Sequence, residues 1–153
     1  MNPHIFQINA SRGGVPKTAV RAATLTATGL TIDVQKLTKF HGGTERALCL
    51  YSLEKILALQ REGHPIYPGS TGENVTLAGV DWDALEIGTR LKLGDEVEVE
   101  ISNYTVPCKQ IAESFIDGNF KRISQVQRPG WARVYVRVLA TGNLVTGQAV
   151  RVL

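Results

Sequence analysis

Strict alternation of apolar and charged residues marks the middle of the chain. Apolar residues alternate with glutamates over 97–101 and with basic residues over 90–93, and Gly94-Asp95 separates the two runs. A period of two places alternate side chains on opposite faces of a strand. A glycine-containing pair between two such runs is typical of a tight turn. The segment therefore predicts an antiparallel β-hairpin with one buried and one solvated face.

A second alternating run lies near the C-terminus. Valines at 134, 136 and 138 alternate with more polar residues, and a Gly142-Asn143 turn precedes Val150 and Val152. This arrangement predicts a second hairpin, between the two valine-containing runs. Further strands are predicted over 5–9, 20–28, 30–37 and 47–51.

Helical spacing is confined to two segments. Ser52 is suited to cap a helix that has an apolar side and ends at Gly63. A second helix is predicted to begin near Pro107, because proline suits the first helical turn, and to end before Gly118. The residues expected on the buried side of the first helix are Leu53, Ile56, Leu57 and Gln60.

Many short strands and few helices predict a mainly β fold. An antiparallel, barrel-like arrangement, closed or nearly closed, leaves few strand edges exposed. With 153 residues, 43% of them hydrophobic, the chain is long enough to bury one core. It contains no internal repeat, low-complexity segment or evident linker. We therefore expect a single domain over residues 1–153.

Charge and cysteine content limit which classes of partner and which cellular compartment we expect for this protein. Lys+Arg 17 against Asp+Glu 14 gives a net charge of +3, which suits an anionic small molecule and is too weak to indicate nucleic acid. No stretch approaches about 18 apolar residues, and the N-terminus lacks the features of a signal peptide. The two cysteines form no C-x-x-C motif. These features predict a cytoplasmic protein that crosses no membrane.

Cys108 is the side chain best placed for chemistry. It follows Pro107 at the predicted start of a helix and precedes Lys109, so backbone N–H groups, the helix dipole and a cation would all favour its thiolate. A thiolate can act as a nucleophile or as a metal ligand. The alternative, which composition alone favours, is that Cys108 simply packs with apolar residues at helical spacing. Cys49, inside the apolar run 47–51, is expected to be buried and structural.

The first of two glycine-rich loops carries positive charge. It spans 39–46 and sets Lys39, His41 and Arg46 around two glycines, an arrangement that can cradle a phosphate. The same residues are equally compatible with an ordinary solvated turn. The loop has neither the spacing of a P-loop nor that of a dinucleotide fingerprint.

The second glycine-rich loop spans 68–74 and is polar. Thr71, Glu73 and Asn74 offer a hydroxyl, a carboxylate and an amide around Gly72, a mixture suited to the polar edge of a heterocycle. Here too a plain turn is the alternative, with Asn74 bonded only to the backbone.

Five short segments, taken in order, resemble the MOSC domain, which is named after the C-terminal domain of molybdenum cofactor sulfurases. The resemblance covers nearly the whole chain and is strongest to the small standalone bacterial members. The chain departs from the family at Gly147-Gln148 and over 29–33, where the family often has Gly-Asp, and we interpret both sites, including Asp33, as altered turns. The matching segments are 11–17, 40–43 continuing to 47–51, 68–74, 107–108 and 130–134.

This resemblance implies a β-rich, barrel-like fold with one functional cysteine, which corresponds to Cys108. In the family that cysteine is regarded either as the thiolate ligand of molybdenum in a bound molybdopterin cofactor or as the carrier of a persulfide. The residues expected around the pterin and its phosphate are, by position, Lys39, His41, Arg46, Thr71, Glu73, Asn74 and Arg133.

Three functions follow as alternatives. The first is a molybdenum-cofactor enzyme that reduces N-hydroxylated compounds with electrons from a separate protein, since the chain lacks the cysteines for an iron–sulfur cluster and any dinucleotide fingerprint. The second is a carrier that receives sulfur from a cysteine desulfurase and delivers a Cys108 persulfide to a metal–sulfur centre. The third is a non-catalytic β-barrel that binds a small molecule.

Pyridoxal phosphate is a further cofactor that the resemblance brings, through the sulfurases. None of the lysines stands in a context that identifies a Schiff-base partner for it.

Overall fold

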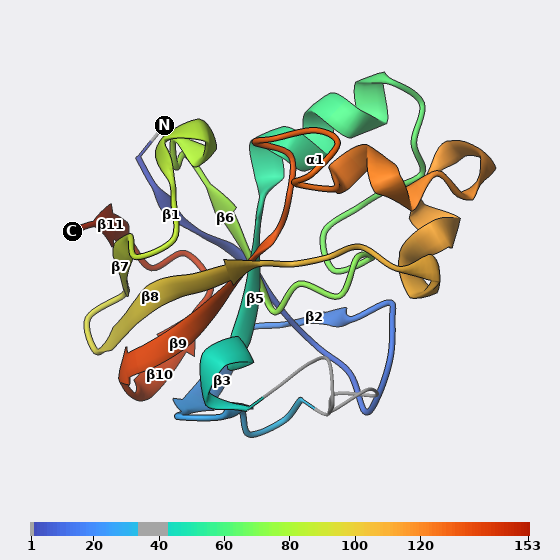
Figure 1. Ribbon diagram of the computed structural model, residues 1–153. Coiled ribbons are helices and arrows are strands. Elements are labelled where there is room, and N and C mark those ends of the chain that lie inside the picture. The colour runs from blue at the N-terminus through green and yellow to red at the C-terminus, as the bar shows by residue number, and fades with distance from the viewer. Residues whose placement is uncertain (1, 34–42) are drawn as a thin grey trace.

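The computed structural model describes residues 2–33 and 43–153, which form mainly strands (Figure 1). Within these residues one sheet has the strand order β11-β7-β8-β9-β5-β6-β1-β2 and a smaller sheet the order β10-β3-β4. The predicted mainly β class is confirmed. The strands are β1 (His4–Ala10), β2 (Thr18–Val20), β3 (Ala22–Thr26), β4 (Gly29–Leu30), β5 (Leu48–Ser52), β6 (Val75–Ala78), β7 (Arg90–Leu93), β8 (Val97–Tyr104), β9 (Val134–Ala140), β10 (Gly142–Val145) and β11 (Val150–Val152).

Helices are short and lie mostly together on one side of the molecule, at the upper right of Figure 1. In the described part of the chain no helix is long and apolar enough to cross a membrane. The helices are α1 (Leu53–Arg61) and the 3-10 helices η1 (Thr44–Arg46), η2 (Trp82–Ala84), η3 (Lys109–Ser114), η4 (Ile116–Gly118) and η5 (Phe120–Ile123).

Hairpin β7–β8 forms as the sequence predicts. The two strands pair antiparallel, with Leu91 opposite Val99 and Leu93 opposite Val97. All four of these side chains are fully buried. The alternation of apolar and charged residues predicts this hairpin correctly because both strands place one face on the core and the other toward solvent.

The predicted C-terminal hairpin is wrong. Strand β9 lies between β8 and β5, so hydrogen bonds to those two neighbours already occupy both of its edges. The last strand, β11, pairs instead with β7. Gly142-Asn143, expected to form the turn, begin strand β10, which pairs with β3 in the smaller sheet. Valine alternation therefore identifies the strands correctly but not their partners.

The large sheet curls without closing into a barrel. A single antiparallel bridge joins His4 to Ala149, and the Ile5 amide donates to the Gln148 carbonyl at 2.9 Å. The two termini accordingly lie on the same side of the molecule (Figure 1). Strands β5 and β6, which flank α1, run parallel, whereas the other ladders between described strands are antiparallel.

Helix α1 forms where it is predicted. The Ser52 hydroxyl accepts a hydrogen bond from the Lys55 amide at 3.1 Å, and Gly63 ends the segment with a left-handed φ of 101°. Leu57, which the sequence places on the buried side, is 41% exposed. The buried stripe is narrower than expected and consists of Leu53, Ile56 and Leu59.

No α-helix follows Pro107, contrary to the prediction. Helices η3, η4 and η5 stand there instead. Phe115 is extended, with φ −130°, and Asp117 is left-handed, with φ 55°, so the backbone twice leaves the helical region. This removes the long helix dipole on which the sequence argument for a Cys108 thiolate relied.

Replacing Ser52 by alanine tests the cap of α1. The Lys55 amide would lose its partner, so we expect the free energy of unfolding, measured by urea denaturation, to fall by about 1 kcal/mol. Ser124→Ala is the control, because the Ser124 hydroxyl makes no hydrogen bond with the described residues. Equal effects of the two substitutions would contradict the role of the cap.

Candidate functional site

Cys108 lies between β8 and η3 with an extended backbone, φ −139° and ψ 174°. Its thiol is free, partly buried, and makes no hydrogen bond with the described residues. Ile111 and Phe115, with which it would pack at helical spacing, are both buried, at 4% and 3% exposure. Cys108 is therefore less buried than these two apolar neighbours, and its functional role and the packing alternative both remain predictions.

Cys49 is buried in β5, as predicted, at 6% exposure. It pairs across the sheet with Tyr135, and its Sγ lies 3.6 Å from the Thr105 hydroxyl. Burial raises the pKa of the Cys49 thiol above its ordinary value, and the nearby Arg133 opposes that rise. Cys49 is thus a protonated structural thiol at neutral pH.

Tyr135 lies opposite Cys49 in the sheet and interacts electrostatically with Cys108. Burial raises the pKa of its phenol, and the nearby Cys49 and Cys108 raise it further. Arg133 and Arg46 lower this pKa and so partly offset the rise. The Arg46 guanidinium also lies 5.7 Å from the centre of the Tyr135 ring. We call these five residues the cysteine–arginine cluster.

Arg133 is the buried cation of this cluster, at 4% exposure. Its Nη1 donates to the Thr71 carbonyl at 2.5 Å, whereas its Nε has no hydrogen-bond partner. Its own carbonyl accepts from the Thr105 amide at 2.9 Å, which fixes the backbone beside β8. A buried donor without a partner is costly, so the position of this guanidinium favours an anionic or polar ligand beside it.

Glu73, in the second glycine-rich loop, is fully buried. The hydroxyls of Thr71 and Thr76 donate to its two carboxylate oxygens at 2.9 and 3.0 Å. Burial raises the pKa of the Glu73 carboxyl, while hydrogen bonds from the backbone of Gly69 and of Glu73 and from the two threonines oppose the rise. Both oxygens are therefore used to fix the loop that holds Arg133.

Asn74 joins the same loop to β5. Its Oδ1 accepts from the Cys49 amide at 2.9 Å, and its Nδ2 donates to Asp33 at 2.8 Å. The backbone amide of Asn74 also donates to the Cys49 carbonyl at 2.7 Å. With 3% exposure, this side chain is occupied by contacts within the protein.

Asp33 is the residue on which three segments converge, and it ends a turn, as the sequence indicates, because its amide donates to the Leu30 carbonyl at 3.2 Å. Lys17 donates to both of its carboxylate oxygens at 2.6 Å, and the Ser11 amide donates at 2.9 Å. The side chains of Lys17 and Asp33 are 8% and 0% exposed. Sequence analysis missed both roles, although Lys17 ends a segment that matches the MOSC family.

Two glycines allow the Lys17 segment and the second glycine-rich loop to touch. Gly69 has a φ of 90°, and a Cβ there would lie 2.3 Å from the Lys17 carbonyl. A Cβ on Gly72, with φ 81°, would lie 2.9 Å from Val15. Any larger residue at either position would separate the segments.

The structure places five of the seven predicted cofactor-binding residues. Lys39 and His41 lie outside the described residues. The structure brings Thr71, Glu73, Asn74 and Arg133 together around Cys49, and places Arg46 beside Tyr135. Within residues 2–33 and 43–153, no three His, Cys, Asp or Glu side chains are grouped so that they could hold a metal ion. The cofactor-binding roles of the predicted residues remain predictions.

Removing the charge of Asp33 tests the convergence of the three segments. Asp33→Asn leaves Lys17 buried without an anion, so we expect a loss of roughly 3–5 kcal/mol in the free energy of unfolding. Asp83→Asn is the matched control, since it breaks an ion pair whose carboxylate is 71% exposed, and should change stability little. A small effect of Asp33→Asn in urea denaturation would contradict the structural role assigned to the pair.

Alkylation with iodoacetamide distinguishes the two thiols. Cys108 should react first at neutral pH because it is accessible. Cys49 should remain slow even as the pH rises toward 9, because burial both shields its thiol and keeps it protonated. Peptide mapping after timed labelling measures both rates, with urea-unfolded protein as the reference. Faster labelling of Cys49 in the folded protein would overturn this assignment.

Comparisons with known proteins bear on the family of this chain. The sequence profile of the MOSC domain matches residues 37–151. The protein YflK of Bacillus subtilis (strain 168) is 32% identical over 114 residues, which are 74% of this chain and 50% of YflK. A protein named reductase from Gibberella moniliformis (strain M3125 / FGSC 7600) is 33% identical over 132 residues, 83% of this chain and 23% of the reductase.

Among solved structures, YiiM from Geobacillus stearothermophilus superposes with a TM-score of 0.78 at 25% identity, over 99% of this chain and 75% of that one. The chain thus spans half of YflK and less than a quarter of the fungal reductase. The profile match covers most of the sequence, and the fold agrees over nearly all of it. The chain belongs to the MOSC domain family, which is associated with binding of the molybdenum cofactor.

Proposed function

We propose that this chain binds a molybdenum cofactor at the cysteine–arginine cluster, with Cys108 as a thiolate ligand of molybdenum, and that it reduces N-hydroxylated compounds. The observation that carries the proposal is the buried guanidinium of Arg133, whose Nε lacks a partner; a partly exposed free thiol, Cys108, supports it, and both residues interact electrostatically with Tyr135. The relative named reductase is consistent with reductive chemistry in related chains.

The residues of the cluster fit such a group. A soft thiolate is a suitable ligand for a transition metal, whereas the phosphate of a pterin cofactor requires cations. Arg133 and Arg46 both supply positive charge near Tyr135. Lys39 and His41, which adjoin Arg46 in the sequence, are proposed to complete the phosphate contacts.

Thr71, Glu73 and Asn74 support this proposal as positioning residues. Glu73 holds the Thr71 hydroxyl, and the Thr71 carbonyl holds Arg133. Asn74 fixes the backbone of Cys49 in β5. Because their polar groups are already engaged, they shape the site in this proposal and leave direct contact with the cofactor to the cations and Cys108.

The proposed reaction converts an N–OH group to N–H, with release of water and consumption of two electrons and two protons. A bound molybdenum cofactor would supply the two-electron chemistry. Cys108 would hold the metal, and Arg133 would neutralise negative charge beside it. Tyr135 keeps its proton at neutral pH because burial raises the pKa of the phenol, so it would add no negative charge beside the cofactor. The electrons are proposed to come from a separate donor protein.

A sulfur carrier is the second candidate function. Transfer of a persulfide between proteins requires an accessible thiol, and Cys108 is accessible while Cys49 is buried. The comparisons give no support to pyridoxal phosphate, which has no part in either proposal.

Cys108→Ser tests both candidates. An alcohol oxygen cannot replace a soft thiolate or carry a sulfur atom, so we expect the variant to fold and to lose molybdenum retention and turnover, or persulfide formation. The measurements are molybdenum content, fluorescence of the oxidised pterin, protein mass and reduction of an N-hydroxylated base with a supplied electron donor.

Ser124→Ala is the control, because Ser124 lies outside the cysteine–arginine cluster and its hydroxyl makes no hydrogen bond with the described residues; it should retain bound molybdenum. Stoichiometric molybdenum and pterin in the wild type support the enzyme, whereas a mass gain of one sulfur atom on Cys108 without molybdenum supports the carrier. Unchanged cofactor content, mass and activity in Cys108→Ser would contradict both.

A further inference from the structure

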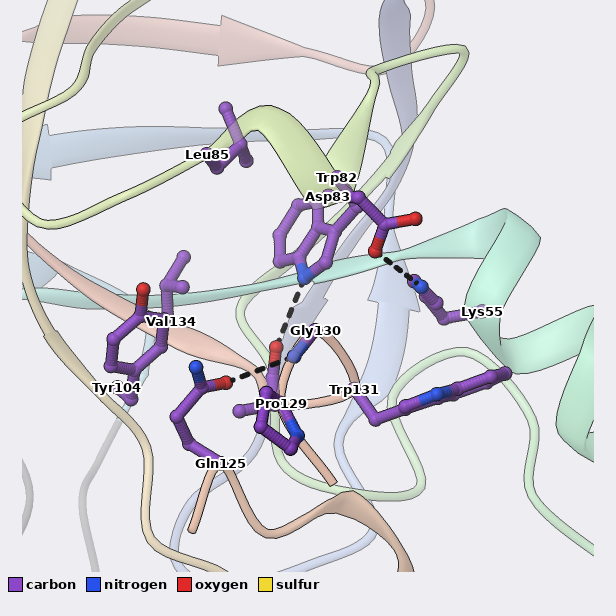
Figure 2. A pocket seen from close by; sticks show the side chains of 11 residues that line it. Lys55, Trp82, Asp83, Leu85, Tyr104, Gln125, Pro129, Gly130, Trp131 and Val134 are labelled. Carbon is purple, nitrogen blue, oxygen red and sulfur yellow. Dashed lines mark hydrogen bonds and ion pairs between the residues drawn. The ribbon is translucent and has the colours of Figure 1, made fainter. Parts of the chain in front are cut away.

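A cavity of about 600 Å³ opens between α1, η2 and the segment that precedes β9 (Figure 2). This volume lies within the range of small-molecule sites. Its wall includes Lys55, Trp82, Tyr104, Gln125, Trp131 and Val134. We call it the Trp82–Trp131 pocket.

The Trp82–Trp131 pocket is separate from the cysteine–arginine cluster, although the same backbone segments contribute to both. None of the five cluster residues lines the pocket. Val134 lines it, while the next residue, Tyr135, belongs to the cluster. Adjacent residues of a strand point to opposite faces. The pocket and the cluster therefore lie on different faces of β9.

Aromatic rings form much of the wall of this pocket. Trp82 is 6% exposed, its Nε1 donates to the Ala132 carbonyl at 3.0 Å, and its ring meets Tyr51 edge to face at a centroid distance of 6.1 Å. Figure 2 shows the Tyr104 ring and the Trp131 indole on opposite sides of the view, with Trp82 above. These contacts hold Trp82, while the Lys55 ammonium and the Arg122 guanidinium lie 4.4 and 4.1 Å from the centre of the Trp131 ring and hold that one. Fixed rings of this kind suit a flat ligand.

Two polar groups on the wall have no partner. Gln125 accepts a hydrogen bond from the Gly130 amide through Oε1 at 3.2 Å, but its Nε2 makes none with the described residues. The Tyr104 hydroxyl likewise has no partner among them. Neither the Gln125 Nε2 nor the Tyr104 hydroxyl is fully buried. Both can therefore form a hydrogen bond with a molecule in the pocket.

The charges of the wall cancel. Among the described residues that line the pocket, Lys55 and Asp83 carry the charges, and their side chains pair at 2.7 Å. The Lys55 ammonium also lies 4.4 Å from the centre of the Trp131 ring. A charged ligand would have to compete with this pair, so the pocket favours a neutral one.

We propose that the Trp82–Trp131 pocket is a second binding site, which takes a neutral, flat aromatic molecule bearing a hydrogen-bond acceptor. The rings contact its faces, and Gln125 and Tyr104 bind its polar edge. This inference goes beyond the function proposed for Cys108 and does not depend on it.

Three probes of equal shape test the proposal: naphthamide, naphthoate and naphthamidine, which are neutral, anionic and cationic. The chain has two tryptophans, both in the pocket wall, so the two indole N–H signals in a proton–nitrogen NMR spectrum report directly on it. We expect naphthamide to shift both signals saturably, with a Kd at least tenfold lower than that of either charged probe. Absence of saturable binding, or equal binding of the three probes, would overturn the proposal.

Gln125→Glu tests the polar contact. It keeps an acceptor for the Gly130 amide but replaces the free donor with a negative oxygen, so naphthamide should bind about tenfold more weakly and naphthamidine more tightly. Gln127→Glu is the matched control, because Gln127 is exposed and does not line the pocket. An equal effect of the two substitutions would overturn the assignment.

Tyr104→Phe provides an independent variant that removes only a hydroxyl, and it should weaken naphthamide binding severalfold; the control is Tyr67→Phe, at an exposed tyrosine outside the pocket. Unchanged binding in Tyr104→Phe would overturn the polar contact assigned to Tyr104. Saturating naphthamide should leave the rate of Cys108 alkylation unchanged. Protection of Cys108 by the probe would show that the pocket and the cysteine–arginine cluster are one site, which would overturn the proposal.

Discussion

The buried ion pair between Lys17 and Asp33 is the contact on which the candidate site depends. Both charges are removed from solvent, and each is stable there only because the other is present. Asp33 also binds the Ser11 amide and the side chain of Asn74. One carboxylate thereby fixes the first strand, the turn after β4 and the second glycine-rich loop relative to one another.

Two hydrogen-bonded routes lead from these residues to the cysteine–arginine cluster, one from the Asp33 carboxylate through Asn74 and one from the Lys17 backbone amide through Gly69 to Glu73. Asn74 binds the backbone of Cys49, and Glu73 acts through Thr71 on Arg133. The polar groups along these routes are buried and bonded, so their geometry is well determined. The Nε of Arg133 is the exception, and it lies where the proposed ligand would bind.

Sequence patterns predict correctly those structural features that depend on residues close together in the chain. The β7–β8 hairpin, the cap at Ser52 and the burial of Cys49 all leave a local signal, and all three are found. The partner of β9 and the bond from Lys17 to Asp33 depend on segments far apart in the chain, which periodicity does not report. The prediction of an α-helix after Pro107 was wrong. Helical spacing there is a weak signal, and tertiary packing commonly overrides such local preferences.

The bridge between His4 and Ala149 has a consequence for the order of folding. It joins the two ends of the described fold, and Cys49 likewise pairs with Tyr135 from much later in the chain. Contacts between such distant residues form slowly, because a long loop must close before they are made. During synthesis β1, β2, β5 and β6 can pair with one another first, whereas β5 gains its second neighbour only after β9 has emerged from the ribosome. The cluster around Tyr135 is accordingly assembled late, when nearly all of the chain is available.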